Sequence, residues 1–540
     1  MKLRNLLFLL GFVVAGLLGY WLARTAVPRM AHRGGEEPVG NAPWQQIVDE
    51  QAPKFRGEDR EATQRRDYAA AIAGAFEGQR MLVFKDADAM AKFLARAGAN
   101  IRLLGKIDQL HALRVGFSNY DDLASLLDGG ADPSFVFPVS IPAPKDGTVQ
   151  PGAVPMGSHL LDFLGVTGDN SSWGKGVRVA VLDTGVTANS AFNANITAIN
   201  LVDLPADPSQ QNGHGTAVAS MIIGSDPLTP GVAPAADILS IRIADDNGQS
   251  DSYLLAKGII TAADAGVSLI NISMGSQGDS PLVHDAIAYA QAKGAMIFAA
   301  AGNNGINGVD HPAADAGVIA VGAVDAAGYH LDFSNTGSQI ALAAPGYALN
   351  AAWTGDQVAS VSGTSFSSPI VLASVAVLMS RPGSPPLTAP QAYQLLMSYL
   401  DVGGAPGTDA TAIGGGMPDI GRVINGNTPG LYDAAIAPIQ IVPPNAGNPY
   451  GQVEVVVQNR GTEALVNTKV QVSIGGGVIS SNITQLAPNA WAVVNVPVNY
   501  PPAGSAPLTV DASVSLSGGV TDSNKSNNHR AATYVPAKSP

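Results

Sequence analysis

Apolar residues in the middle of the chain gather into short continuous runs separated by segments with helical periodicity. The runs are VRVAVLD (177–183), DILSIRIA (237–244), SLINISM (268–274), AMIFAAA (295–301) and VIAVGAV (318–324). Helical patterns lie between the first four, notably at 251–264 and 281–293, and two more helices are expected over 365–379 and 389–400. Strands that are apolar throughout are buried on both faces. Residues 158–428 are therefore predicted to form an α/β domain, with a parallel sheet between two layers of helices.

A smaller module is predicted over residues 80–142, ahead of a Pro/Gly-rich boundary at 143–157. Strand-like runs and helical patterns follow one another there in the order β-α-β-β-α-β, at 81–84, 87–99, 101–104, 113–117, 120–127 and 135–141. This order is the split βαβ arrangement, which is a small α+β fold.

After Pro429 the hydrophobic period changes to two. Short alternating runs are separated by Gly, Pro and Asn turns, and they are QVEVVVQN (452–459), TKVQVSI (468–474), WAVVNVPV (491–498) and LTVDASVSL (508–516). The pattern predicts an all-β, immunoglobulin-like sandwich over residues 429–540.

The first 26 residues have the pattern of an export segment. Lys2 and Arg4 precede an uncharged run of 18 residues, Leu6–Ala23. That run is longer than a typical signal-peptide core of about 7–15 residues and just long enough to span a bilayer. Arg24 stands where a cleavage site would need a small residue. An uncleaved membrane anchor and a cleaved signal both remain open, and either predicts export of the rest of the chain, with residues 27–79 as a polar linker.

The composition limits the kinds of catalytic and binding groups that the chain can use. The chain has 540 residues, no cysteine and a net charge of −13, from 30 basic and 43 acidic residues. Its length fits about three domains. The acidic balance argues against nucleic acid as the main partner, because phosphate binding needs a basic surface. Without cysteine there is no thiol nucleophile, disulfide or Cys-based metal site, so the chemistry must come from Ser, His, Asp, Glu, Asn and the backbone.

Four segments of the α/β domain place a polar group at the end of an apolar element. Asp183 ends the strand VAVLD, and Asn303 follows the strand IFAAA. His214 opens a helix after a Gly turn, and Ser365 opens the helix at 365–379. Catalytic groups of open α/β sheets collect at the carboxyl ends of the strands, so we expect these four side chains to lie together.

These residue types match the needs of acyl transfer. A serine hydroxyl needs an adjacent base, and a neutral imidazole can take its proton and return it to a leaving amine. A buried carboxylate fixes the tautomer of the imidazole and stabilises its charged form. The tetrahedral oxyanion needs preset donors, which the Asn303 amide and the Ser365 backbone N–H can supply.

In the order Asp–His–Ser, the motifs DTG (183–185), HGT (214–216), AAAGNNG (299–305) and GTSFSSP (363–369) resemble those of the subtilisin-like serine proteases, the subtilases. The resemblance extends over about 156–428. It implies a subtilisin-like three-layer fold and a serine endopeptidase, with Asp183, His214 and Ser365 as the catalytic triad and Asn303 as the oxyanion donor.

The same resemblance implies a substrate-binding surface. Ser273, Met274 and Gly275 are expected to pair with the substrate backbone as an added strand. The turn that contains Gly248 would line the opposite side of the cleft. Gly302, beside Asn303, would let a substrate backbone approach closely.

Three other functions share parts of these motifs. DTG is also the aspartic-protease signature, but that class needs a second such carboxylate and the sequence has no other DTG or DSG. G-x-S-x-G would indicate an α/β-hydrolase, yet Ser367 occupies the final Gly position. A catalytically inactive homologue, serving as a surface adhesion or binding protein, remains the main rival, although no triad member is replaced.

No cofactor is expected to be required. Calcium is possible but has no recognisable site, because the segment after His214 lacks the Asn-rich loop of calcium-binding subtilases. The acidic stretch ADDNGQSD (244–251) is interpreted as a turn rather than a ligand loop, since Asn-Gly is a turn signal. No metal ligands are assigned, because the remaining histidines, which are His32, His111, His159, His284, His311, His330 and His529, show no ligand spacing.

The flanking modules also resemble known ones. Residues 80–142 resemble the inhibitory prodomain of subtilases, which predicts a zymogen that cleaves itself between about Pro142 and Gly157. The prodomain would then be an intramolecular inhibitor, and other polypeptides would be the substrates. The C-terminal sandwich resembles CARDB-type modules of exported proteins, and its role is left open between a stabilising spacer and a binder of a surface partner.

Overall fold

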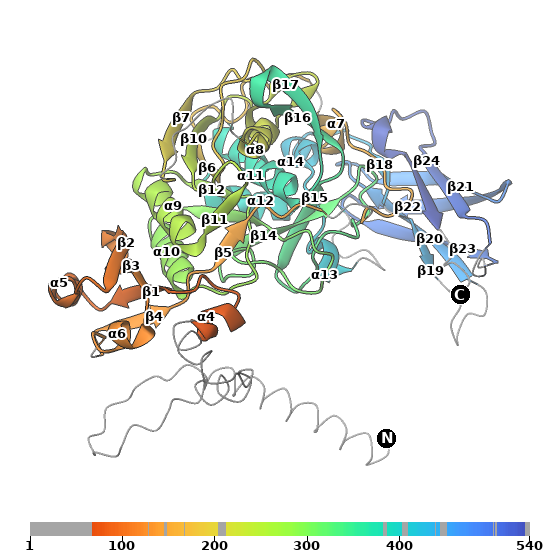
Figure 1. Ribbon diagram of the computed structural model, residues 1–540. Coiled ribbons are helices and arrows are strands. Elements are labelled where there is room, and N and C mark those ends of the chain that lie inside the picture. The colour runs from red at the N-terminus through yellow and green to blue at the C-terminus, as the bar shows by residue number, and fades with distance from the viewer. Residues whose placement is uncertain are drawn as a thin grey trace, which may run out of the picture.

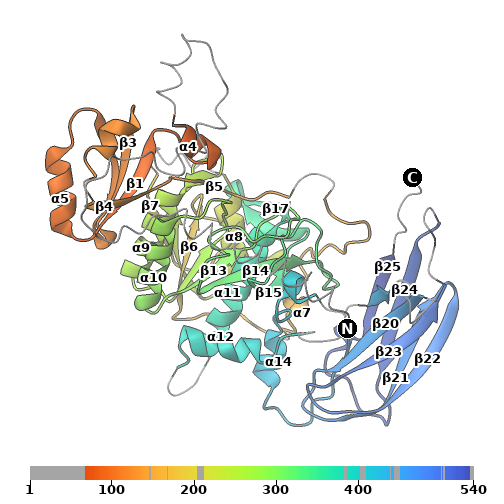
Figure 2. The same cartoon turned by 90° about the horizontal axis from the view of Figure 1, so that it is seen from below.

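The computed structural model describes residues 67–127, 129–144, 148–166, 168–202, 212–381, 386–401, 409–437, 439–442, 451–499, 502 and 505–534. The predicted export segment and most of the linker, up to residue 66, lie outside these ranges. Within them, no helix is both long enough and apolar enough to cross a bilayer. The chain forms a central α/β domain with a smaller module on either side, and the two small modules lie at opposite sides of it (Figures 1 and 2).

The central domain is built on one parallel sheet of seven strands in the order β15-β14-β13-β12-β6-β10-β7. The strands are β6 (Arg178–Asp183), β7 (Ile196–Asn200), β10 (Asp237–Arg242), β12 (Leu269–Ile272), β13 (Met296–Ala300), β14 (Val318–Val324) and β15 (Ile340–Pro345). The five predicted apolar runs are all strands of this sheet. Their continuous burial confirms the parallel α/β fold that the pattern predicted.

Helices cover both faces of the sheet. The helices α8 (His214–Ile223), α11 (Thr364–Ser380) and α12 (Ala389–Met397) pack on one face, in a core that includes Val179 and Phe298. The helices α9 (Ser252–Asp264) and α10 (Pro281–Ala292) pack on the other, in a core that includes Leu182 and Ile297. Successive residues of a strand thus face different helical layers, and this three-layer arrangement brings the starts of α8 and α11 to the carboxyl edge of the sheet (Figure 1).

The N-terminal module, residues 67–137, contains the predicted β-α-β-β-α-β order. It consists of α4 (Tyr68–Ile72), β1 (Gln79–Phe84), α5 (Ala87–Arg96), β2 (Ile101–Ile107), β3 (Ala112–Phe117), α6 (Tyr120–Ala124) and β4 (Ala131–Ser134). The sheet order is β2-β3-β1-β4, with antiparallel neighbours throughout. Leu82 and Leu113 face the module's own helices, whereas Met81 and Ala112 belong to the core formed with α9 and α10.

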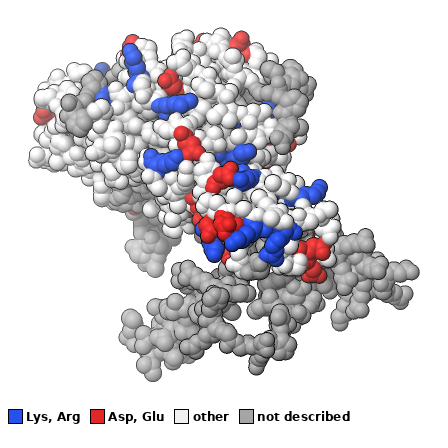
Figure 3. All heavy atoms as spheres, turned by 90° about the vertical axis from the view of Figure 1, so that its left-hand side faces the viewer, with Lys and Arg blue, Asp and Glu red and all other residues white. Residues whose placement is uncertain are grey.

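The surface of this side of the molecule carries charges of both signs. In Figure 3, which shows the side that lies at the left of Figure 1, Lys and Arg side chains stand next to Asp and Glu side chains. The N-terminal module has exposed ion pairs of this kind, Lys92–Asp88 and Lys106–Asp108. Neighbouring charges of opposite sign largely cancel, so this face has no extended field of one sign.

The predicted strand over 135–141 was wrong in its bounds. The module's last strand is β4, and a separate strand, β5 (Pro138–Ser140), pairs instead with β11 (Gln249–Asp251) of the central domain. Period-two alternation identifies an extended segment but not its partner, and here the partners lie in two different domains.

The C-terminal sandwich, residues 434–534, has two antiparallel sheets. One has the order β18-β20-β19 with β23 also paired to β20, and the other has the order β22-β21-β24-β25. The strands are β18 (Ala434–Ile436), β19 (Gln440–Val442), β20 (Gly451–Asn459), β21 (Leu465–Ile474), β22 (Gly477–Leu486), β23 (Trp491–Val498), β24 (Leu508–Ser515) and β25 (His529–Tyr534). Inward-facing valines of both sheets form its core, among them Val455, Val470 and Val510, as expected for a sandwich.

Candidate active site

The carboxyl edge of the parallel sheet gathers the four side chains that the sequence singles out. Asp183 is the last residue of β6, and Asn303 follows β13 by three residues. His214 is the first residue of α8, and Ser365 is the second residue of α11. All four are buried, and none is more than 6% exposed.

Asp183 and His214 form a hydrogen-bonded pair. The Nδ1 atom of His214 lies 2.9 Å from Oδ1 and 3.0 Å from Oδ2 of Asp183. The carboxylate is further held by the backbone N–H of Thr184, which donates to Oδ1 at 2.7 Å. A carboxylate at Nδ1 favours the tautomer with its proton there, which leaves Nε2 free to accept one. Nε2 is buried and has no hydrogen-bond partner among the described residues.

The close approach of α8 to β6 depends on glycine. A Cβ atom on Gly215 would lie 2.3 Å from the carbonyl oxygen of Gly185, so any larger residue would push the start of the helix away. The HGT motif therefore has a packing reason as well as a chemical one, because it sets the distance between His214 and Asp183.

Ser365 is anchored to the end of β12. Its Oγ donates to the carbonyl of Ser273 at 3.2 Å, and the Ser273 hydroxyl donates to the carbonyl of Ser365 at 2.6 Å. Asn271 extends this network, because its amide donates to Ser273 and its Oδ1 accepts from Ser368. These bonds fix the first turn of α11 against the strand that precedes the expected substrate-binding residues.

The orientation of the Asn303 amide is set by Thr364. Both the backbone N–H and the hydroxyl of Thr364 donate to Oδ1 of Asn303, each at 2.9 Å. With Oδ1 occupied, Nδ2 points the other way and donates to the carbonyl oxygen of Pro142. A fixed N–H donor aimed at a carbonyl is the geometry that stabilises an oxyanion.

Residues Pro138–Pro142, here called the cleft segment, lie between the two walls of the site. Ser140 exchanges two backbone hydrogen bonds with Gly275, of 3.0 and 2.9 Å. On the other side, β5 pairs with β11, and the N–H of Ile141 donates to the carbonyl of Gly248 at 3.2 Å. The chain's own segment is thus the middle strand of a three-stranded arrangement, which ends with the Pro142 carbonyl at Asn303.

The structure thereby places each residue expected to bind substrate. Gly275 and Gly248 contact the cleft segment through their backbones. Ser273 anchors Ser365, and the Met274 side chain is fully buried in the core beneath the strand. Gly302 lies behind Asn303 with a φ of 106°, and a Cβ there would come within 2.5 Å of Asp310.

Asp310 closes the space behind these glycines, a role that the sequence motifs do not assign to it. Its carboxyl group contacts Gln277 and lies 3.3 Å from Nδ2 of Asn335. Burial raises the pKa of Asp310 to about 6, although the charge of His311 and the hydrogen bond from Gln277 oppose the shift. No local signal marks this residue, because it meets Gly275 and Gly302 only in the folded chain.

The acidic stretch at 244–251 forms a turn, as predicted. Oδ1 of Asp245 accepts from the backbone N–H groups of Asn247 and Gln249, and Asp246 pairs with Arg242 at 2.9 Å. Both carboxylates are therefore engaged within the turn. Among the described residues, one group of side chains could hold a cation, at Asp279, His284, His311 and Asp315.

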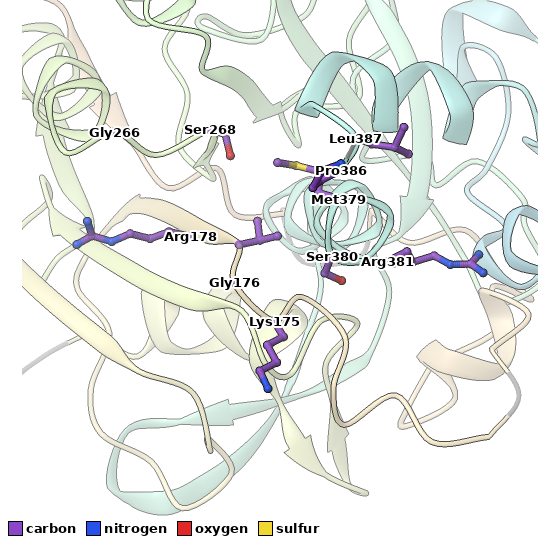
Figure 4. Close-up of a pocket in the computed structure, with 11 residues that line it drawn as sticks. Lys175, Gly176, Arg178, Gly266, Ser268, Met379, Ser380, Arg381, Pro386 and Leu387 are labelled. Atoms are coloured by element: carbon purple, nitrogen blue, oxygen red, sulfur yellow. The ribbon is translucent and has the colours of Figure 1, made fainter. Parts of the chain in front are cut away.

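A pocket of about 540 Å³ lies elsewhere, at the opposite edge of the sheet. It is lined by residues at the amino end of β6, including Lys175 and Arg178, and by the end of α11, including Arg381. Figure 4 shows these three basic side chains pointing in different directions. Since Asp183 is at the other end of β6, this pocket is separate from the candidate site.

Comparison with known proteins agrees with the geometry. A profile of the subtilase family matches residues 174–416, and a profile of the CARDB family matches residues 439–532. The thermostable alkaline protease of Halalkalibacterium halodurans is 35% identical over 254 residues, which cover 46% of this chain and 68% of that protein. The thermophilic serine proteinase of a Bacillus species (strain AK1) is 33% identical over 323 residues, covering 56% and 78%.

Among solved structures, the epidermin leader peptide processing serine protease of Staphylococcus aureus superposes with a TM-score of 0.54 at 20% identity. The match covers 65% of this chain and 98% of that one. At this identity the likeness supports the fold alone.

Proposed function

The chain belongs to the subtilase family of serine endopeptidases, and from this we propose that Ser365, His214 and Asp183 are its catalytic triad. We further propose that the protein is made as a zymogen, which cuts its own chain between Pro142 and Ala143. The observation that carries the proposal is the carbonyl of Pro142, which accepts from Nδ2 of Asn303 while the preceding residues pair with both walls of the cleft.

The reaction uses each group in turn. The Ser365 hydroxyl leaves the carbonyl of Ser273 and gives its proton to Nε2 of His214, while Oγ bonds to the carbonyl carbon of the substrate. The Asn303 amide and the backbone N–H of Ser365 hold the oxyanion, and Asp183 stabilises the imidazolium. Collapse breaks the C–N bond, His214 protonates the leaving amine, and water then hydrolyses the acyl-enzyme by the same steps.

In the zymogen the substrate is the chain itself. The antiparallel pairs at Ser140 and at β5 give the cleft segment the position of an added strand, a general way of binding extended peptides through the backbone. After cleavage the same pairs would keep the N-terminal module in place as an inhibitor until it dissociates. Other polypeptides would then bind as extended strands in the same cleft.

The experiment is to express the full chain as wild type and as Ser365→Ala, and to measure intact masses. The wild type is expected to yield a product that begins at Ala143, whereas Ser365→Ala remains whole. Loss of the nucleophile in subtilisin, a member of this family, lowers turnover by on the order of 10⁶-fold. The matched control is Ser367→Ala, since this buried serine of the same helical turn donates to the carbonyl of Pro345 instead.

Different failures have different meanings. A cut in the Ser365→Ala protein would reject self-cleavage, and a wild-type product that begins elsewhere in 143–157 would reject only the assigned bond. The rival function, a catalytically inactive adhesion protein, predicts that a fluorophosphonate probe leaves processed protein unlabelled. Labelling that depends on Ser365 excludes that rival.

Cleavage at this bond would also affect whether the mature enzyme stays attached to the membrane. The apolar run Leu6–Ala23 supports export of the chain. Because the run precedes Ala143, the cut would separate it from the catalytic domain whether or not it is an anchor. The mature enzyme is then proposed to be released, with Ala143 as its first residue.

A further inference from the structure

Four side chains from two separate segments of the chain converge beside the substrate cleft. Asp279 precedes α10, and His284 is in the first turn of that helix. His311 and Asp315 belong to the loop between β13 and β14. Each residue offers one ligand atom, and all four atoms lie within 4.8 Å of one another.

The contacts among them centre on one carboxylate. Nε2 of His284 lies 2.7 Å from Oδ1 of Asp279 and 3.4 Å from Oδ1 of Asp315. Nδ1 of His311 contacts that same oxygen of Asp315. In a tetrahedral zinc site with bonds of about 2.0–2.1 Å, neighbouring donor atoms lie about 3.3 Å apart. The closest pairs therefore need to move apart and the widest, at up to 4.8 Å, need to approach by about 1.5 Å to surround an ion.

Burial supplies an independent indication. The Asp315 side chain is 3% exposed, and its second oxygen, Oδ2, is buried without a hydrogen-bond partner among the described residues. A buried carboxylate oxygen without a partner is costly unless a cation compensates for its lost hydration. His311 is partly buried, and Asp279 and His284 are exposed, so the group forms a cup with Asp315 at its base and an opening to solvent.

We propose that Asp279, His284, His311 and Asp315 bind one divalent transition-metal ion of the zinc class. Two imidazole nitrogens and two carboxylate oxygens suit zinc, nickel or cobalt, whereas calcium and magnesium select oxygen ligands alone. Four protein ligands fill a tetrahedral shell, so the ion is structural and leaves no position for a reacting water.

The site links the two loops that form one wall of the cleft. Ser276, next to Gly275, exchanges backbone hydrogen bonds of 2.9 and 2.8 Å with His311. Asp310, which lies against Gly275 and Gly302, precedes His311 directly. A metal held by both loops would fix this wall, and it would stabilise the folded chain according to its concentration relative to Kd.

The test is a zinc titration of the processed protein, inactivated with a serine-directed inhibitor, in competition with a chromogenic zinc chelator. The wild type is expected to take up one zinc ion per chain. The double variant His284→Gln/His311→Gln should bind zinc at least about 10-fold more weakly. Loss of even a residue that only hydrogen-bonds to a metal ligand lowers metal affinity by about that factor or more. His159→Gln, which removes an exposed histidine paired with Asp162 at 3.0 Å, should bind as the wild type does.

Two further measurements keep the result unambiguous. Circular dichroism and labelling of Ser365 show whether the variants fold. Cobalt bound by the wild type should give the intense visible absorption of a tetrahedral site, and millimolar calcium should not displace it. Zinc uptake that is absent in folded wild type, or equal in wild type and double variant, would overturn the proposal and leave the group as an ordinary His–Asp ion-pair network.

Discussion

The two modules that flank the catalytic domain are attached in different ways. The N-terminal module is held by the cleft segment, by an apolar contact with α9 and α10, and by polar contacts that extend to the rim of the interface. Among these are Gln109 with Asp264 at 2.7 Å and the hydroxyl of Tyr253 with the carbonyl of Lys106 at 3.1 Å. When the module leaves, water can replace these polar partners, and an extended substrate can replace the cleft segment.

The C-terminal sandwich is held by charges that water does not reach. Arg460, which follows β20, forms ion pairs with Asp401 and Asp419 of the catalytic domain, and none of the three side chains is more than 8% exposed. Burial alone would lower the pKa of Arg460, yet the surrounding carboxylates, Asp401 first, raise it above its usual value. Arg422 adds a hydrogen bond of 2.5 Å to Asn489 of the sandwich.

The two interfaces are suited to different roles. Separating the sandwich would break ion pairs among buried charges, in a network that also includes Arg422 and Asp433. The polar contacts of the N-terminal module include the exposed pair Gln109–Asp264, whose groups water can already reach. The proposed self-cleavage would also cut the covalent link on the N-terminal side alone. We therefore expect the first interface to open after processing and the second to persist, and four substitutions probe this contrast.

The largest effect on stability is expected from Arg460→Met. Removal of one partner from a buried ionic group leaves Asp401 and Asp419 uncompensated, which typically costs about 3–5 kcal/mol. The free energy of unfolding of inhibitor-blocked, processed protein, measured by urea denaturation, should fall by that amount. Lys469→Met, which removes an exposed charge of β21, is the control. Equal stability of the two variants would show that the buried charges do not hold the sandwich.

Asn303→Ala tests the other interface at its catalytic end. Loss of one oxyanion donor lowered turnover by about 10²–10³ in subtilisin, itself a subtilase, and we expect a similar loss for peptide hydrolysis and for the cut after Pro142. Asn304→Ala, which changes the exposed neighbour, should leave both rates near those of the wild type. Undiminished turnover in Asn303→Ala would reject the assigned donor.

Sequence analysis predicted the parts of the fold and site that depend on local pattern. The apolar runs gave the central strands, but β7 and β15 were missed. The first is an edge strand whose residues are half-exposed or exposed, and the second is rich in alanine. The motif residues Asp183, His214, Asn303 and Ser365 could be named because each lies at the end of a periodic element.

Residues that act through contacts between distant segments could not be found in this way. Thr364 orients Asn303 across 61 positions of the chain, and His284 meets Asp315 only through folding. The strand over 135–141 was wrong for the same reason. Alternation marks the residues as extended, while β5 is fixed by its partner β11 in another domain.

Asp433→Asn tests how the stability provided by the sandwich interface depends on pH. Burial raises the pKa of Asp433 to about 6 from 3.8, against the charge of Arg460 and the hydrogen bond from Asn527, while Asp522 and Asp419 add to the increase. The folded state thus binds more protons than the unfolded state between those values. Stability contributed by this group is therefore present at low pH and is lost as pH rises through 6.

We expect the free energy of unfolding to fall more steeply with rising pH in the wild type than in Asp433→Asn. Between about pH 4 and pH 6 the wild type should lose up to about 3 kcal/mol through Asp433, a loss that the asparagine variant avoids. Free energies of unfolding of both proteins, measured at intervals across this range, provide the check. Parallel curves for the two proteins would mean that Asp433 is not desolvated in the folded state.

The smallest effect is expected from Arg114→Met in the N-terminal module. Nη1 of Arg114 lies 2.7 Å from Oδ2 of Asp251, across the interface that should open. Asp251 keeps its hydrogen bonds to the first turn of α9 without Arg114, so the loss should be only about 1.4 kcal/mol, or a tenfold faster release of the cleaved module. Release is measured as the lag before processed protein gains peptidase activity, with the exposed Arg102→Met as control. A lag unchanged by Arg114→Met would mean that the cleft segment, the apolar contacts and the other polar contacts hold the module. A lag abolished outright would mean that the Arg114–Asp251 pair is as essential as Arg460, and that the two interfaces do not differ in kind.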